Sequence, residues 1–105
     1  MSLFSKQNSI NNIEYFCLLG RLTVHNVTDY QQQGNELLIA SPLGVGFDLS
    51  EAEVEGSVVI ALLISWQRKA LAKGKTLTIT NAPENILAMA DVSGVRSILP
   101  FNENP

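Results

Sequence analysis

The sequence predicts an α/β fold, because one segment contains a strand, a helix and a second strand in succession. Residues 45–80 begin with a short apolar run, pass through an acidic loop into an amphipathic stretch, and end in alternating threonine and aliphatic residues. A β–α–β unit of this kind builds a parallel or mixed sheet with helices on its face. The chain has 105 residues and is 46% hydrophobic, which suits one domain with one core.

Two strands and a helix are expected before this unit. Residues 14–19 are rich in aromatic and apolar side chains, which indicates a strand; a turn at Gly20 and Arg21 then leads to a short second strand that begins at Leu22. Apolar residues next recur every three or four positions, which indicates one helix face, and these are Val24, Val27, Tyr30, Gly34, Leu37 and Leu38.

Gly34 leaves two interpretations of this helix open. A glycine inside a helix weakens it by about 1 kcal/mol relative to alanine. Either Gly34 permits close packing of the helix on the sheet, or it breaks the helix in two. The side chain of Thr23 or Asn26 is expected to cap the first turn of the helix.

The central unit is expected to place a helix between two neighbouring strands, residues 45–49 and residues 76–80. Ser57 is placed to cap this helix and Gly74 to end it. Its apolar stripe comprises Val58, Val59, Leu62, Leu63, Trp66 and Ala70, and Trp66 is assigned to the core rather than to a partner contact.

A third helix is expected after the second strand of this unit. Asn81 is its predicted cap, Pro83 is tolerated in its first turn, and Gly94 ends it. A short apolar segment that Pro100 closes follows. The predicted order is therefore two strands, a helix, a strand, a helix, a strand, a helix and a short last element.

The chain ends are expected to lie outside the domain. Residues 1–12 are polar and predict a flexible segment, residues 101–105 predict a loose tail, and the domain is assigned to residues 13–100. No apolar run reaches the ~18–20 residues that span a bilayer, and the N-terminus lacks the apolar stretch of a signal peptide. These features favour a cytoplasmic protein.

The acidic loop after the central strand is the main candidate for a functional surface. Asp48, Glu51, Glu53 and Glu55 surround the point where the strand passes into the helix. Loops at the carboxyl ends of parallel strands commonly carry function in such folds. Oxygen ligands suit Ca²⁺ or Mg²⁺, but the regular spacing of a calcium loop is missing, so a solvated acidic rim is favoured.

The charge of the chain argues against a nucleic-acid partner. The net charge is −3, with seven lysine and arginine residues in total, whereas binding to phosphates needs clustered cations. One basic cluster, Arg68, Lys69, Lys73 and Lys75, follows the stripe of the second helix. We favour the interpretation that these cations complement the helix dipole and aid solubility over the interpretation that they bind phosphate.

Other reactive side chains have simple structural explanations. His25 is the sole histidine and has no spaced partner for a metal, so a surface position or a capping role is expected. Cys17 is the only cysteine and lies in a predicted strand, which indicates a buried thiol. Gly74-Lys75-Thr76 lacks the upstream glycine of a phosphate loop and leads into a strand. No cofactor or metal is expected, and no catalytic pair is recognised.

The chain resembles the STAS domain family over about residues 13–100. The matching stretches are Phe47-Asp48-Leu49-Ser50, Glu55-Gly56-Ser57-Val58-Val59, Gly74-Lys75-Thr76-Leu77-Thr78-Ile79 and residues 86–95. This resemblance implies a mixed sheet of four or five strands with helices packed mainly on one face. Within the family, residues 61–64, 70–78 and 81–85 are most similar in style to the small cytoplasmic subunit of the ABC transporter that maintains outer-membrane lipid asymmetry.

That resemblance implies a non-catalytic subunit that docks on the cytoplasmic ATPase of a phospholipid transporter and is peripheral to the inner membrane through this partner. A weak homodimer is left open. The alternative within the family is an anti-sigma factor antagonist, a regulatory switch that binds an anti-sigma kinase. The partner-binding residues that the resemblance implies are Ser50, Glu51, Glu53, Glu55, Gly56, Ser57 and Val58.

The phosphorylation position of the family is altered in this chain. The family's aspartate falls on Glu55, its switch hydroxyl on Gly56, and its motif glycine on Val58. Gly56 has no side chain to phosphorylate. A shift of one residue would make Ser57 the acceptor, although a capping role for Ser57 is favoured.

Overall fold

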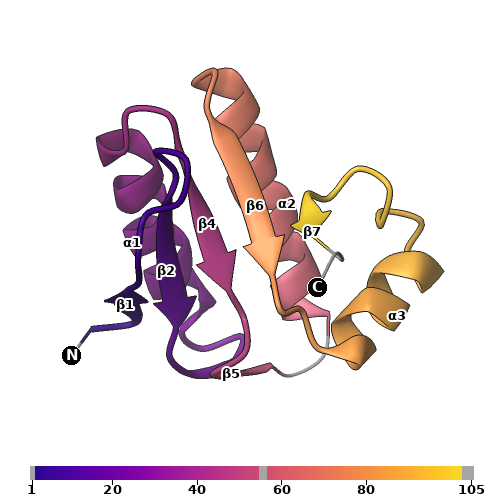
Figure 1. The fold of residues 1–105 in the computed structure, drawn as a ribbon. Helices are drawn as coiled ribbons and strands as arrows, with labels where there is room; N and C mark the ends of the chain where they lie inside the picture. The colour runs from indigo at the N-terminus through magenta and orange to yellow at the C-terminus, as the bar shows by residue number, and fades with distance from the viewer. Residues whose placement is uncertain (1, 55–56, 103–105) are drawn as a thin grey trace.

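A computed structural model describes residues 2–54 and 57–102 of the chain. Strands and helices alternate through most of it (Figure 1). In chain order the elements are β1 (Phe4–Lys6), β2 (Glu14–Leu18), β3 (Gly20–Leu22), α1 (Val27–Ala40), β4 (Gly44–Asp48), β5 (Ala52–Val54), α2 (Val58–Ala72), β6 (Thr76–Thr80), α3 (Glu84–Val92) and β7 (Phe101–Asn102).

The main sheet is mixed and has five strands in the order β1-β2-β4-β6-β7. β1 runs antiparallel to β2, whereas β2, β4, β6 and β7 run parallel to one another. A separate pair, β3 and β5, lies beyond the carboxyl ends of the parallel strands (Figure 1). The predicted α/β class with a mixed sheet is confirmed.

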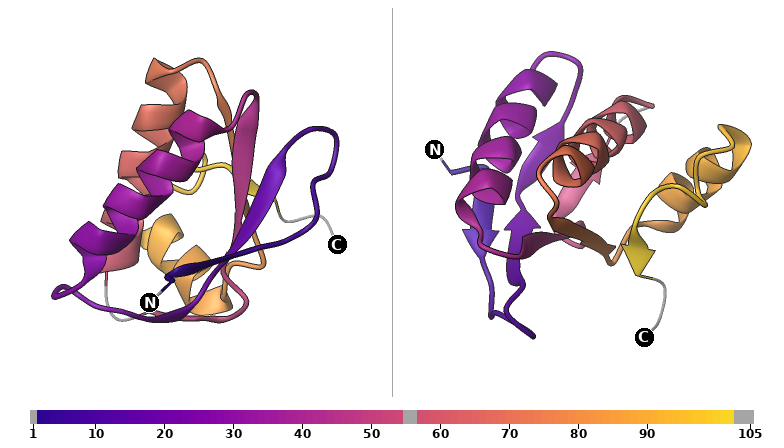
Figure 2. Two further views of the ribbon diagram at one scale, coloured as in Figure 1. Left: turned by 90° about the vertical axis from the view of Figure 1, so that its left-hand side faces the viewer. Right: turned by 90° about the horizontal axis from the view of Figure 1, so that it is seen from above.

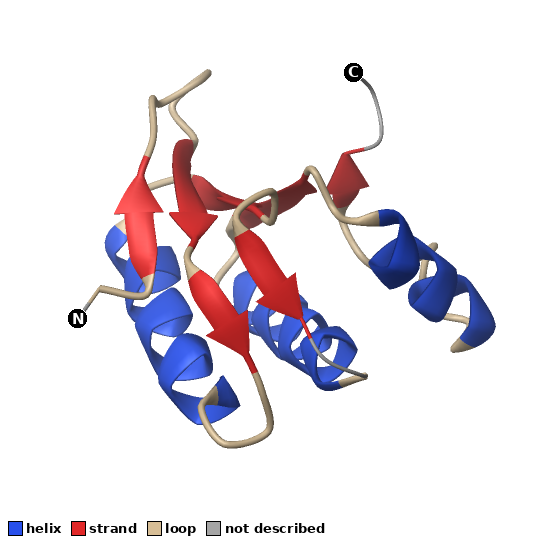
Figure 3. Cartoon of the chain, turned by 90° about the horizontal axis from the view of Figure 1, so that it is seen from below, coloured by secondary structure: helices blue, strands red, loops and turns tan. Residues whose placement is uncertain are grey.

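The helices gather on one face of the sheet. Viewed from above, α1 and α2 lie side by side over the strands, and α3 lies beside α2 toward the β7 edge (Figure 2). Seen from below, the helices lie on one side of the strands (Figure 3), and in Figure 1 the strands lie in front of α1 and α2, so no helix of the described part of the chain covers the other face. The prediction that helices pack mainly on one face is therefore confirmed.

The core forms between this helix layer and the sheet, because alternate residues of each strand point to opposite faces. In β4, Val45 and Phe47 are fully buried with 0% exposure. Phe4, Phe47 and Trp66 form an aromatic cluster, with ring centroids 4.5 Å apart for Phe47 and Trp66 and 5.3 Å apart for Phe4 and Phe47. Trp66 is fully buried, as its place on the helical stripe predicts.

Gly34 does not break the first helix, since α1 is continuous through Ala40. Its backbone lies against the indole of Trp66 on α2, whose Nε1 donates a hydrogen bond of 3.3 Å to the carbonyl oxygen of Gln31. Close packing is thus the correct interpretation. The neighbour is the second helix, however, and not the sheet.

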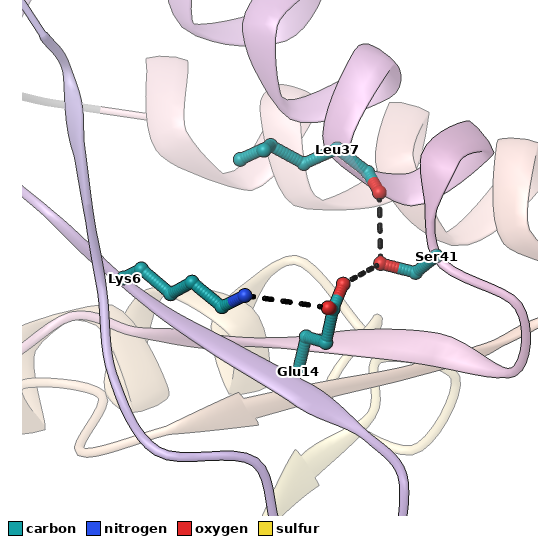
Figure 4. Close-up of polar contacts among 4 residues, drawn as sticks. All are labelled: Lys6, Glu14, Leu37 and Ser41. Atoms are coloured by element: carbon teal, nitrogen blue, oxygen red, sulfur yellow. Dashed lines mark hydrogen bonds and ion pairs between the residues drawn. The ribbon is translucent and has the colours of Figure 1, made fainter.

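Polar contacts join the first two strands to the end of α1. Ser41 Oγ lies 2.8 Å from Glu14 Oε2 and 3.0 Å from the carbonyl oxygen of Leu37, and Lys6 Nζ lies 3.5 Å from Glu14 Oε1 (Figure 4). The hydrogen bond from Ser41, aided by the charge of Lys6, lowers the pKa of Glu14 despite some desolvation. The junction connects β1, β2 and the turn that enters β4.

One part of each predicted chain end requires correction. Residues 1–12 were expected to be flexible, yet Phe4–Lys6 forms the antiparallel edge strand and Phe4 is only 8% exposed. Residues 101–105 were expected to be loose; Phe101–Asn102 pairs with β6, whereas residues 103–105 lie outside the described residues. Few residues form each of these strands, and polar neighbours surround them, so neither gives the alternating pattern that marks a longer strand.

The predicted side-chain caps are also wrong. Asn26 occupies the cap position of α1, but its side chain accepts from the backbone N–H of Thr23 instead of from the helix. α3 begins after Pro83, and Asn81 has a positive φ of 54° with its amide turned to Asp48. Asparagine favours turns as readily as caps, and a single sequence does not separate the two roles.

Candidate protein-interaction surface

The loop that follows β4 lies at the carboxyl ends of the parallel strands. In Figure 1 the described part of the loop passes beneath the arrowheads of β2 and β4 and includes the short strand β5. The backbone N–H of Leu49 donates 3.0 Å to the carbonyl oxygen of Thr80, and that of Ala52 donates 3.2 Å to Leu49. These bonds attach the start of the loop to the end of β6.

Asp48 is the anchor of this loop. Its carboxylate is buried, at 7% exposure, and accepts hydrogen bonds from the Ser50 backbone N–H at 2.8 Å, the Gln7 side chain at 3.0 Å and the Asn81 side chain at 3.1 Å. Burial opposes its ionisation, but these donors outweigh burial and hold the pKa of Asp48 below its ordinary value. Asp48 therefore does not belong to the solvated rim that the sequence predicted.

The sequence did not indicate the partners of Asp48. Gln7 comes from the N-terminal segment and Asn81 from the turn after β6, so residues far apart in sequence meet at this carboxylate. An open polar pocket of about 900 Å³ adjoins it on the helix-free face, lined in part by Tyr15 and Asn102. The Phe-Asp-Leu-Ser motif identified the acid but gave no information about its donors.

The remaining acids of the predicted rim are exposed where the structure describes them. Ser50 and Glu51 lie in the turn after β4, and Glu53 lies in β5. β5 pairs in parallel with β3, so that Glu53 stands opposite Arg21. The second sheet thus presents this part of the loop as a short, ordered ribbon.

The end of the surface is the first turn of α2. Ser57 is exposed at the cap position and Val58 is half-buried. The Ser57 hydroxyl makes no capping hydrogen bond, although its carbonyl oxygen accepts from Ile60 N at 3.1 Å. The expected side-chain cap is therefore wrong. The other two predicted partner-binding residues, Glu55 and Gly56, lie outside the described residues.

No other constellation of reactive groups lies close to this surface in residues 2–54 and 57–102. In that part of the chain, no three His, Cys, Asp or Glu side chains are grouped as metal ligands. Cys17 is buried, and burial, followed by the charge of Asp48, raises the pKa of its thiol. His25 is exposed. The described part of the surface accordingly presents charged side chains and hydroxyl groups that could contact a partner.

Several solved structures share this fold. A putative anti-sigma factor antagonist from Thermotoga maritima has a TM-score of 0.79 at 10% identity, covering 96% of this chain and 86% of its own. An anti-sigma factor antagonist from Mycobacterium paratuberculosis has a TM-score of 0.76 at 17% identity, with the same coverage. The antagonist SpoIIAA in its unphosphorylated form has a TM-score of 0.65 at 12% identity, covering 97% and 89%.

These likenesses define the fold class, that of small α/β domains with a mixed sheet and helices on one face. Residues 17–100 match the family described as "Mlab, STAS domain". The chain belongs to the STAS family. A search of the curated proteins found no match. None of the helices in the described residues is long and apolar enough to cross a membrane.

Proposed function

We propose that the chain is a non-catalytic interaction subunit that docks on the cytoplasmic ATPase of an ABC phospholipid transporter. The docking surface is the segment from Ser50 to Val58 with the exposed side of α2. The observation that carries the proposal is the switch position, where Gly56 offers no hydroxyl to a kinase. Stable docking needs only a complementary surface, and the exposed Glu51 and Glu53 supply charge for it.

Charge reversal tests this docking surface. We expect Glu53→Lys combined with Glu55→Lys to weaken capture of the cognate ATPase in a pull-down without lowering the melting temperature. Glu36→Lys is the matched control, because Glu36 is exposed on α1, away from the loop. Unchanged capture by the double variant, or equal weakening by the control, would refute the surface.

An anti-sigma factor antagonist is the second candidate function. The observation in its favour is the Ser57 hydroxyl, which is exposed at the first turn of α2 and takes no part in capping. A phosphate there would add a charge of about −1.5 to −2 beside the positive end of the helix dipole. The solved structures that share the fold include proteins described as anti-sigma factor antagonists.

Mass spectrometry separates the two candidates. Protein purified from its native cells should carry no phosphate in the peptide that contains Ser57 if the chain is a docking subunit. Co-purification should recover an ABC ATPase, whose activity should change when the chain is removed. A stoichiometric phosphate on Ser57 together with recovery of a serine kinase would replace the first function by the second.

A further inference from the structure

A groove of about 570 Å³ runs along the outer side of α1 and α2, away from the sheet. It is lined by Gln31 and Asn35 of α1 and by one face of α2, which comprises Ala61, Ile64, Ser65, Arg68, Lys69 and Ala72. The side chains of Gln31 and Ser65 join its two walls through a hydrogen bond of 2.6 Å. Because Trp66 packs on Gly34 directly beneath, the two walls are held at a fixed separation.

The basic side of the groove has cations without acceptors. The side chains of Arg68 and Lys69 make no hydrogen bond or ion pair with any residue in the described ranges. Two other lysines are engaged: Lys75 donates hydrogen bonds to carbonyl oxygens of α1, and Lys6 pairs with Glu14. In a chain of net charge −3, two adjacent free cations in a groove provide a local site for an acidic group.

On the opposite wall, the side-chain amide of Asn35 has no hydrogen-bond partner among the described residues. Asn35 Oδ1 is buried and accepts no hydrogen bond from the described residues, and the amide nitrogen of Asn35 makes no hydrogen bond within the same residues. A buried acceptor without a donor costs stability, which a bound ligand can relieve. The side-chain amide carries donors and an acceptor side by side, and rotation about its last torsion exchanges them. This pattern matches the N–H and C=O of one residue in an extended peptide.

We infer that this groove is a docking site for an extended, acidic segment of a partner protein. The Asn35 amide pairs with the backbone of the segment, while Arg68 and Lys69 pair with its carboxylates. A helical segment fits less well, because its backbone groups are already bonded internally. The groove uses part of the exposed side of α2 that belongs to the docking surface proposed above, but its other wall is α1 and it does not include the loop from Ser50 to Ser57. The inference does not depend on the identity of the partner.

The dimensions set the length of the segment. Ala61 and Ala72 stand at the two ends of the groove on α2, about 17 Å apart at the helical rise per residue. An extended segment of about five residues spans that distance. A test peptide of about eight residues therefore covers the groove with a margin at each end.

The probe is a fluorescent peptide of about eight residues in which Glu alternates with Ser, so that it remains extended. Its affinity for the full chain is measured by fluorescence anisotropy. A second peptide with Gln in place of each Glu serves as the neutral control. We expect the acidic peptide to bind at least about tenfold more tightly than the neutral one, with an affinity that falls as salt rises.

Three variants locate the site. Arg68→Glu with Lys69→Glu should weaken the acidic peptide about tenfold or more, whereas Lys73→Glu, exposed on the same helix end but outside the groove, should weaken it much less. Asn35→Leu should also weaken binding while leaving the melting temperature unchanged or raised, since it removes an unpaired acceptor. That combination distinguishes loss of a contact from loss of the fold.

Three results would overturn the inference. Equal binding of the acidic and neutral peptides would show that charge does not contribute to binding. Equal effects of Lys73→Glu and of the double reversal would show that the attraction is nonspecific and not located in the groove. Competition by inorganic phosphate at concentrations similar to those of the peptide would make the groove a site for free anions instead of a protein segment.

Discussion

A Cβ atom placed on Gly34 would lie 2.5 Å from three ring atoms of Trp66, closer than any real packing contact. The two helices therefore approach through a position where only hydrogen fits. Trp66 has no room to retreat, since it is fully buried and also contacts Phe47.

Gly34→Ala should destabilise the protein. Alanine gains about 1 kcal/mol of helix propensity over glycine, but overpacking a filled core costs about 1–3 kcal/mol. Because the clash is with a rigid indole, we expect the second effect to win, with a net loss of up to about 2 kcal/mol in urea unfolding. Thr28→Ala, exposed on the same helix, is the control and should not destabilise. A more stable Gly34→Ala variant would contradict the close contact.

Lys75→Met should weaken the end of the first helix. Lys75 Nζ lies 3.1 Å from the carbonyl oxygen of Leu38 and 2.5 Å from that of Ile39, so it satisfies carbonyl groups that the last turn of α1 leaves free. Methionine keeps the length of the side chain and removes the donors. We expect a loss of about 1 kcal/mol by chemical unfolding, against little change for Lys73→Met, which is exposed. Equal stability of both variants would show that the bonds contribute nothing.

Asp48→Asn should change how stability depends on pH. The pKa of Asp48 is lowered in the folded state below its ordinary value, so the unfolded chain binds more protons at acidic pH. The stabilisation is present above the unfolded pKa and is lost as pH falls through the folded one. Unfolding free energies from pH 6 down to pH 3 should therefore fall less steeply in the variant, and its stability at pH 7 should be lower by about 1–2 kcal/mol.

The slope should be reduced and not abolished in that variant. Glu14 also has a lowered pKa, mainly because of the hydrogen bond from Ser41, and it remains in place. Adding Ser41→Ala should flatten the profile further. Parallel profiles for the wild type and Asp48→Asn would mean that the hydrogen bonds of Asp48 do not favour its charged form.

The isolated chain should neither bind nor hydrolyse ATP. Gly74, Lys75 and Thr76 lead into β6, whereas a phosphate loop leads into a helix whose N–H groups face the phosphates. Calorimetry with ATP and magnesium should give no heat of binding, and phosphate release should match the blank. Micromolar affinity in the purified chain would require a nucleotide-dependent role in place of the docking role.

The helices and central strands could be predicted because their patterns are long. The apolar stripe from Val58 to Ala70 predicts a helix, and the alternation of residues 76–80 predicts a strand. In both cases the predicted boundaries lie within a residue or two of the observed ones. Strands β1, β5 and β7 have two or three residues each, too few for a period to appear. Their existence depends on neighbours that are distant in sequence.

The candidate surface was predictable in position but not in detail. The acidic loop was placed correctly after the central strand, yet Asp48 was grouped with the exposed acids although it is buried. Its burial is a consequence of Gln7 and Asn81, which approach from other parts of the chain. Likewise, Ser57 stands at the cap position that its residue type favours, but its hydroxyl makes no capping hydrogen bond.

The edge strand β1 affects how the chain can be trimmed or fused. Removing residues 2–6, which look dispensable from their polarity, would extract the Phe4 ring from contact with Phe47 and Trp66. It would also uncover the backbone hydrogen-bonding groups of β2. In the shortened protein β2 would become an exposed edge strand, and a cavity would remain where the Phe4 ring had been. An exposed edge strand favours aggregation. Purification tags are therefore better joined ahead of an intact N-terminus.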